Sequence, residues 1–285
     1  MTFERIAILG TGLIGGSFGL ALKRSLPGCR VIGWDRQAVL ARARERGAID
    51  ETAQELVAAV DQADLVYVAL PLGVALELLP QIARHARSGA LVTDACSVKG
   101  PVCRAAAACL VSGGARFLGA HPMAGREAPG IEHASAELFR GARYALIAGK
   151  DDADARVRQF AALVESLGAQ PMWLDAERHD WAVAIVSHLP QLAAVALAGV
   201  VRDETDETGL PVELAGPGLR DALRLAGSPY EMWRDICLTN AENVTRALDR
   251  LIQALDHLRS NLKTRRLQRQ FDAANEVYKL LRGMK

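Results

Sequence analysis

A glycine-rich turn near the amino terminus constrains the fold of this chain more than any other feature. The segment Gly10–Gly15 has the sequence GTGLIG, follows a short apolar run at Arg5–Leu9 and opens a helical pattern. In such a unit the first glycine permits a tight turn, the second lets a pyrophosphate approach the backbone, and the third lets helix pack on strand. The helix start then faces the anion with free N–H groups. The pattern predicts a dinucleotide cradle with contacts from Gly10, Gly12, Leu13, Ile14 and Gly15.

An acidic residue at the end of the next apolar run supports this interpretation. Asp35 lies twenty residues after Gly15 and directly follows the run Arg30–Trp34. A carboxylate at this place can accept both hydroxyls of an adenosine ribose and would repel a 2′-phosphate, which favours NAD over NADP. Arg36 follows and can pair with such a phosphate, so the preference is not strict. The alternative is a turn whose glycines serve packing alone, with Asp35 on the surface.

The order of apolar runs and helical patterns predicts the fold class. Seven runs are expected to be strands: Arg5–Leu9, Arg30–Trp34, Leu65–Leu70, Ala90–Thr93, Arg116–Ala120, Arg143–Ala148 and Gln170–Leu174. Helical patterns lie between the first five, at Ile14–Ser25, Arg36–Arg46, Gly73–Arg87 and Gly100–Leu110. This alternation predicts an α/β fold, a Rossmann-like, doubly wound, mostly parallel sheet over residues 1–175.

The strand signal disappears after residue 175. The remaining helical patterns are Ala176–Val200, Asp221–Leu225, Pro229–Leu262 and Thr264–Leu281. Ser228 and Pro229 form an expected helix start, with a capping side chain and a proline at the first helical position. We therefore expect an all-α domain over residues 176–285.

Charge and cysteine content exclude several classes of protein. The 285 residues carry 34 Lys and Arg against 33 Asp and Glu, so no global charge attracts nucleic acid. The five cysteines are odd in number and form no Cys-x-x-Cys pair, which argues against a disulfide framework and a cysteine-rich zinc site. The apolar run at the amino terminus is too short for a signal peptide. We expect a cytoplasmic protein with reduced thiols and no bound metal.

One apolar stretch has the length of a membrane span. Ala182–Val201 contains 20 residues without a charge. Ser187, His188, Pro190 and Gln191 interrupt it near the middle, and no basic cluster flanks it immediately. We therefore expect a helix buried within a homodimer rather than a membrane span. Its polar side chains then need partners.

Two segments that follow predicted strands are placed to line the nicotinamide end of the cradle, because ligands of open α/β sheets bind beyond the carboxyl ends of the strands. Leu70 and Pro71 end the third predicted strand, and TDACSVKG at residues 93–100 ends the fourth. Ser97 in that segment is suited to orient a hydroxyl group. A role for Ser97 as the cap of the following helix is equally compatible with the sequence, and Lys99 is interpreted as structural.

A histidine follows the fifth predicted strand. His121 comes directly after the run Arg116–Ala120. Imidazole titrates near neutral pH and can accept a proton from an alcohol while a hydride leaves. The sequence thus favours His121 as an acid–base group, with a histidine that only bonds its own loop as the alternative.

Taken together, these motifs resemble the prephenate/arogenate dehydrogenase family of tyrosine biosynthesis. The segments that carry the resemblance are GTGLIGGS at 10–17, Asp35, TDACSVKG at 93–100, HPMAGRE at 121–127, SHLPQL at 187–192 and RDALRLAGSPYEMWRDI at 220–236. The resemblance implies NAD-dependent oxidative decarboxylation of prephenate to 4-hydroxyphenylpyruvate, of arogenate to tyrosine, or of both. It also implies the form of the enzyme without a chorismate mutase or a regulatory domain, and dimerisation through the helical domain.

The resemblance also implies roles for individual residues. His121 matches the catalytic histidine that bonds the ring hydroxyl, Ser97 the serine that positions it, and Arg224 the arginine that holds a substrate carboxylate. The other implied substrate-binding residues are Asp221, which orders that arginine, Arg126 and Glu127 on a loop at the pocket entrance, and Ser187, His188 and Gln191 on the apolar helix.

The chain departs from the family pattern at two places. Gln191 stands where many relatives carry histidine, and Ala222 and Leu223 replace a more usual pair of threonines. Both departures lie near the side-chain end of the substrate, where prephenate has a keto acid and arogenate an amino acid. The sequence therefore leaves the choice between the two substrates open.

Two other functions use the same cradle. A β-hydroxyacid dehydrogenase would be expected to carry a catalytic lysine in the helical domain, and Ala182–Val201 contains none. A non-catalytic, NAD-binding interaction protein would not need His121, Ser97 and Arg224.

Overall fold

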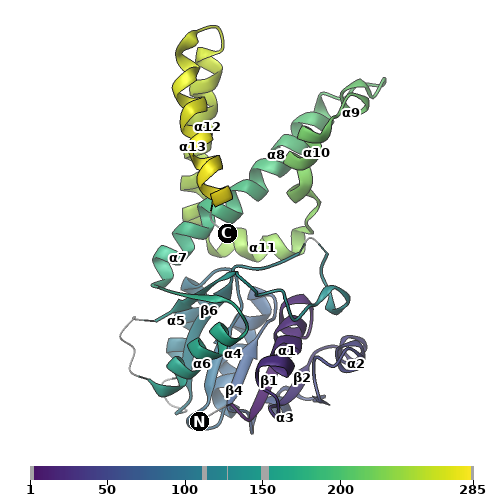
Figure 1. Ribbon diagram of the computed structural model, residues 1–285, viewed down its shortest axis with the longest axis vertical. Coiled ribbons are helices and arrows are strands. Elements are labelled where there is room, and N and C mark those ends of the chain that lie inside the picture. The colour runs from purple at the N-terminus through teal and green to yellow at the C-terminus, as the bar shows by residue number, and fades with distance from the viewer. Residues whose placement is uncertain (1–2, 111–113, 127, 149–153, 284–285) are drawn as a thin grey trace.

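The computed structural model describes residues 3–110, 114–126, 128–148 and 154–283. An α/β part and a helical part follow each other along the chain, the helical part lying above the sheet in Figure 1. One sheet has the strand order β3-β2-β1-β4-β5-β6-β7-β8. Its strands are β1 Arg5–Leu9, β2 Arg30–Trp34, β3 Glu51–Thr52, β4 Leu65–Val68, β5 Leu91–Asp94, β6 Arg116–Pro122, β7 Arg143–Ile147 and β8 Gln170–Leu174.

The sheet is mostly parallel, as predicted. Strands β1 to β6 run parallel to one another, β7 pairs antiparallel with β6, and β8 pairs parallel with β7. The order reverses between β1 and β4, which is the place where open α/β sheets bind ligands. Gly10 lies at this switch with φ +89°, and a Cβ there would stand 2.4 Å from the carbonyl oxygen of Ala69. Only glycine fits both the left-handed backbone and this close approach.

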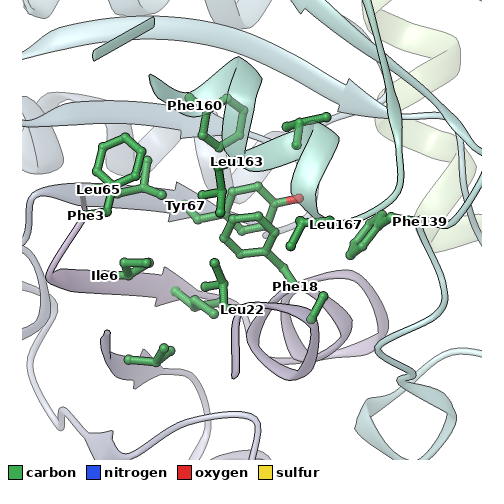
Figure 2. Close-up of a cluster of buried hydrophobic side chains, with 14 of the residues drawn as sticks. Phe3, Ile6, Phe18, Leu22, Leu65, Tyr67, Phe139, Phe160, Leu163 and Leu167 are labelled. Atoms are coloured by element: carbon green, nitrogen blue, oxygen red, sulfur yellow. The ribbon is translucent and has the colours of Figure 1, made fainter. Parts of the chain in front are cut away.

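Helices cover both faces of the sheet. They are α1 Leu13–Ser25, α2 Gln37–Glu45, α3 Leu56–Val60, α4 Leu72–His85, α5 Gly100–Cys109 and α6 Ala155–Ser166, with a short 3₁₀ helix, η1, at Ile131–His133. On the α1 and α6 face, Phe18 stacks on Tyr67 at 3.9 Å between ring centroids, with Phe139 and Phe160 nearby (Figure 2). A second core joins α3, α4 and α5 to the other face. The fold class is therefore confirmed.

The observed elements differ from the predicted ones at informative places. The predicted elements do not include the two-residue strand β3 or the helices α3 and α6. Strand β6 also runs two residues past the predicted end at Ala120, because His121 and Pro122 pair with Ala145 and Tyr144 of the antiparallel β7. His121 therefore lies within the strand, and the ladder fixes its backbone.

The helical part is built on one long helix. It consists of α7 Ala176–Val183, a π-helical turn η2 at Ala184–His188 and α8 Leu189–Asp203. The π turn ends two residues before Pro190, which has no N–H for the regular ladder. The elements that follow are α9 Leu210–Glu213, α10 Pro217–Leu223, η3 Arg224–Gly227, α11 Tyr230–Thr239, α12 Ala241–Asn261, η4 Arg265–Leu267 and α13 Gln268–Gly283.

Two arms of the helical part extend away from the sheet in Figure 1. One arm is α8 with α9 and α10, and the other is the hairpin of α12 and α13, whereas α11 lies close to the top of the sheet. The helix Ala176–Asp203 is long and apolar enough to cross a membrane, with a mean hydropathy of 1.8 over its most apolar 18 residues. A single helix of this kind is weak evidence for a span, and this one carries the buried polar residues His179, Asp180, His188 and Gln191.

We expect a methyl group on Gly19 to destabilise the fold. Its Cβ would stand 2.2 Å from the carbonyl oxygen of Ala48, which is backbone and cannot swing aside. Gly19→Ala should therefore lower the free energy of unfolding by about 1–3 kcal/mol. Gly218→Ala is the matched control, because a Cβ there meets nothing within 4 Å. Urea unfolding followed by circular dichroism measures both, and equal stabilities of the two variants would contradict the packing argument.

Candidate active site

The glycine turn has the shape that a pyrophosphate requires. Gly12 caps the start of α1 and contributes no side chain to it, and a Cβ on Gly12 would meet no atom within 4 Å. A Cβ on Gly15 would instead stand 1.9 Å from the carbonyl oxygen of Gly10. Gly15 therefore serves close packing, while Gly12 leaves open space before the positive end of the helix.

Asp35 joins the end of β2 to this turn. Its Oδ2 accepts hydrogen bonds from the N–H of Thr11 at 2.7 Å and from the Thr11 hydroxyl at 3.3 Å. Its Oδ1 accepts the N–H of Arg36 at 2.7 Å, whereas the side chain of Arg36 is 88% exposed. A fixed carboxylate beside an open glycine turn fits the ribose and pyrophosphate of NAD.

Leu70, Pro71 and Ser97 lie at the same edge of the sheet. A Cβ on Gly10 would stand 3.1 Å from Cδ2 of Leu70, so this side chain borders the turn. Ser97 is half-buried in the segment between β5 and α5. The alternative role of Ser97 as helix cap is wrong, because α5 begins after Lys99 and its first N–H groups bind another side chain.

That side chain is Asp180, the last member of a chain of hydrogen bonds that starts at His121. Nδ1 of His121 lies 2.9 Å from Nε2 of His179, and Nδ1 of His179 lies 2.8 Å from Oδ1 of Asp180. The Asp180 carboxylate also accepts the N–H groups of Lys99 and Gly100, each at 2.7 Å. This series of hydrogen bonds thus connects β6, through α7, to the start of α5.

The charge of Asp180 is stabilised within the protein. Desolvation alone would raise the pKa of this carboxyl, but the hydrogen bonds from His179, Lys99 and Gly100 outweigh it and the pKa is lowered. Asp180 is therefore ionised at neutral pH and acts as an acceptor only.

An ionised Asp180 sets the tautomers of both histidines. As a neutral imidazole, His179 donates its Nδ1–H to the carboxylate and offers its Nε2 as an acceptor. His121 then donates its Nδ1–H to that acceptor, which leaves the lone pair of its Nε2 available. The geometry therefore supplies a base at Nε2 of His121.

Burial, together with nearby positive groups, keeps this base neutral. Desolvation lowers the pKa of His121 well below its usual 6.5, and the nearby His179, Lys99 and His188 lower it further. Lys99 is fully buried, forms an ion pair with Asp94 and donates to the carbonyl oxygen of Ala120 at 2.7 Å. Lys99 thus holds the backbone next to His121, in line with its interpretation as structural.

A second buried group adjoins the histidine chain. Asn240 donates through Nδ2 to the carbonyl oxygen of Asp180 at 2.8 Å, and Nδ2 lies 3.3 Å from Nδ1 of His188. The amide donor makes Nδ1 of His188 an acceptor and leaves the proton on Nε2. Desolvation lowers the pKa of His188 to about 4, although Asp180 opposes the shift.

Two buried donors in this group have no partner among the described residues. They are Nε2 of His188 and Nε1 of Trp233, whose rings meet edge to face with centroids 5.8 Å apart. A buried donor left without an acceptor costs about 1–3 kcal/mol. Both donors are therefore available to an oxygen atom of a bound ligand.

The structure distributes the remaining predicted residues as follows. Gln191 is buried, and its amide bonds to η3, the turn that begins at Arg224. Ser187 is half-buried in η2, whereas Asp221, Arg224 and Arg126 are exposed in the single chain. Glu127 lies outside the described residues. Within the described ranges, no three His, Cys, Asp or Glu side chains form a group that could hold a metal ion.

Sequence reasoning missed His179, Asp180, Trp233 and Asn240. His179 is 58 residues from His121 along the chain, so no local spacing connects them. The available signal was a pair of ionisable residues, His179-Asp180, two residues before the charge-free stretch Ala182–Val201.

Comparison with known proteins identifies the family. The family model for the prephenate dehydrogenase nucleotide-binding domain matches residues 18–172, and the model for the prephenate dehydrogenase dimerization domain matches residues 175–283. The chain belongs to the prephenate dehydrogenase family. The two models thus cover strands β2 to β7 as well as the helical part.

Individual relatives support this assignment. Prephenate dehydrogenase from Lactococcus lactis subsp. cremoris is 34% identical over 256 residues, which are 90% of this chain and 70% of that protein. The prephenate dehydrogenase from A. aeolicus, solved with hydroxyphenyl propionate and NAD+, has a TM-score of 0.87, 28% identity and coverage of 100% and 99%. Synechocystis arogenate dehydrogenase has a TM-score of 0.79, 31% identity and coverage of 96% and 99%. The chain is accordingly an NAD-dependent oxidoreductase.

We expect His121 to be a neutral Nδ1–H tautomer at pH 7. Because the pKa of His121 lies well below 6.5, its ring should gain a proton only as the pH falls below that value. Long-range ¹H–¹⁵N NMR of histidine-labelled protein distinguishes the two tautomers, and His121→Asn and His179→Asn assign the signals. A Nε2–H tautomer at His121, or a midpoint at or above 6.5, would show that the chain of hydrogen bonds does not operate.

Proposed function

We propose that this protein catalyses the NAD-dependent oxidative decarboxylation of prephenate to 4-hydroxyphenylpyruvate. The observation that carries the proposal is the neutral His121, with its Nε2 lone pair at the carboxyl edge of the sheet and its Nδ1 bonded to the His179–Asp180 pair. Arogenate, whose oxidation gives tyrosine, is the alternative or additional substrate. The sequences at Gln191 and Ala222-Leu223 leave the preference between them open.

The residues of the site have two tasks in the reaction: one group transfers a proton, and the others align the substrate. Bound NAD supplies the hydride acceptor. Nε2 of His121 takes the proton of the ring hydroxyl as the hydride leaves the carbon that bears it. The bond to the ring carboxylate then breaks, its electron pair enters the ring, and CO₂ departs. His121 returns the proton to the phenolate oxygen, so the base ends the cycle neutral. Such acid–base groups contribute roughly 10²–10⁴ in rate.

Alignment is assigned to residues of both parts of the chain. Arg224 holds a substrate carboxylate, Asp221 orders that arginine, and Ser97 positions His121 and the substrate. Arg126 is assigned to the pocket entrance, and so is Glu127, which lies outside the described residues. His188 and Ser187 belong to the wall formed by the long helix, and the buried donor at Nε2 of His188 supports this assignment.

The wider organisation follows the same proposal. We assign residues 1–175 to a dinucleotide-binding domain and residues 176–285 to a substrate and dimerisation domain. The protein acts in the cytoplasm on a small acid, without a nucleic acid or membrane partner. The long apolar helix carries His179, His188 and Gln191, whose side chains form hydrogen bonds inside the protein. These bonds support a place for the helix within the protein and not in a membrane.

Activity assays test the proposal directly. NADH formation at 340 nm should occur with prephenate or arogenate and NAD, and be much weaker with NADP. His121→Asn should lower kcat by about 10²–10⁴ with a modest change in KM, because only the proton acceptor is lost. His133→Asn, at an exposed histidine, is the control. Absence of NADH with both substrates would refute the function, and an unaltered kcat in His121→Asn would refute the role of the base.

We also expect a homodimer, because the two arms expose large apolar side chains. Helix α13 has no buried residue, and the exposed set includes Val200, Ile252, Leu255, Phe271, Val277 and Leu281. Light scattering after size exclusion should give twice the 30.6 kDa of the chain. Ile252→Glu with Leu255→Glu should shift the mass toward the monomer, whereas Ala41→Glu on exposed α2 should not. A monomer in the unmodified protein would contradict the assignment.

A further inference from the structure

The buried amide of Gln191 connects the long helix to the turn that carries Arg224. Nε2 of Gln191 donates to the carbonyl oxygen of Leu225 at 2.8 Å. Its Oε1 accepts the hydroxyl of Ser228 at 3.3 Å. Leu225 lies within η3 and Ser228 directly follows it, so one side chain bonds to both ends of this turn.

This arrangement uses both ends of the amide inside the protein. Gln191 is only 3% exposed, and each of its two polar atoms has a protein partner. The hydroxyl of Ser228 binds Gln191 and does not cap α11. The capping residue of α11 is Pro229, which makes no side-chain hydrogen bond. The Gln191–Ser228 pair is therefore a feature of the turn, and burial of the amide restricts the access of a ligand to its remaining N–H and lone pair.

The position of Gln191 along the long helix determines what its hydrogen bonds to η3 connect. Gln191 lies three residues after His188, whose ring belongs to the buried cluster beside Asp180. Arg224 is the first residue of η3 and immediately precedes Leu225. Gln191 thus fixes the distance between the helix wall near His188 and the backbone that carries the Arg224 guanidinium.

We propose that Gln191 is a positioning residue that sets Arg224 by clamping η3, and that it does not contact the substrate. The inference rests on the proposed function, in which Arg224 holds a substrate carboxylate. Because the clamp acts through the arginine, it should affect prephenate and arogenate alike. Gln191 therefore supports substrate affinity without selecting between a keto and an amino side chain.

A carboxylate at this position is the sharpest test. Gln191→Glu keeps the size of the side chain, removes the donor to Leu225 and places a negative charge against its carbonyl oxygen. KM should rise about 10-fold for each accepted substrate, as expected for the loss of one buried hydrogen bond, while kcat and the KM for NAD change less than about twofold. Gln170→Glu makes the same chemical change at an exposed residue and should leave every constant unaltered.

A double-mutant cycle identifies the route of the effect. If the clamp acts through Arg224, Gln191→Glu should have no further effect on KM in the Arg224→Ala background. An undiminished effect in that background, or a changed ratio of the two substrate KM values, would place Gln191 on the substrate and overturn the proposal. Ser228→Ala removes only the weaker bond and should raise both KM values by a smaller common factor, which keeps the test available if Gln191→Glu fails to fold.

Hydrogen exchange gives a readout that does not depend on activity. The N–H of Ser228 bonds to the same Leu225 oxygen at 3.2 Å, so loosening the turn should speed amide exchange at residues 225–228 in Gln191→Glu but not in Gln170→Glu. Unaltered exchange would overturn the clamp. Faster exchange in a protein that oxidises neither substrate would support the clamp and refute the proposed function instead.

Discussion

The carboxylate of Asp180 is the group on which the site depends. It belongs to the helical part, yet it accepts the first N–H groups of α5 in the sheet part and the Nδ1–H of His179. A buried carboxylate is costly unless it is bonded in this way, and the positive start of a helix favours it. The same carboxylate therefore both holds α7 against the start of α5 and orients His121 through His179. A disturbance at this contact would affect both the position and the tautomer of the base.

A second carboxylate of the helical part, that of Asp235, also binds the start of a helix that packs on the sheet. Oδ2 of Asp235 in α11 accepts the N–H of Gly73 at the start of α4, at 3.1 Å. A Cβ on Gly73 would stand 2.7 Å from that oxygen, so glycine lets the two elements approach. The helical part is thus held against two helix starts at the carboxyl edge of the sheet. His188 and Trp233, whose buried donors have no partner within the described part of the chain, belong to the segments held in this way.

The parts of this protein that are local in sequence are the parts that sequence reasoning identifies. The glycine turn, Asp35 and His121 are recognisable because strand ends place them at one edge of the sheet. The His179–Asp180 pair is not, because its bonds to His121 and to Lys99 and Gly100 join residues 58 to 81 positions apart. For the same reason Ser228 is predicted as a cap but bonds to Gln191, and the predicted helix Pro229–Leu262 is interrupted at Asn240, whose amide binds the Asp180 carbonyl. The π turn and the two-residue β3 leave no periodic signal of their own.

In the proposed mechanism, the burial of His121 and the charges around it explain how one base can serve both proton transfers. Its low pKa means that it accepts a proton only while the departing hydride makes the hydroxyl strongly acidic. The resulting imidazolium is disfavoured by the buried Lys99 but remains bonded through His179 to the negative Asp180. It is therefore stabilised enough to form and too acidic to persist beside a phenolate, so the proton returns once the ring has become aromatic. A base with the ordinary pKa of histidine would retain that proton more readily, and the desolvated position at the end of β6 prevents this.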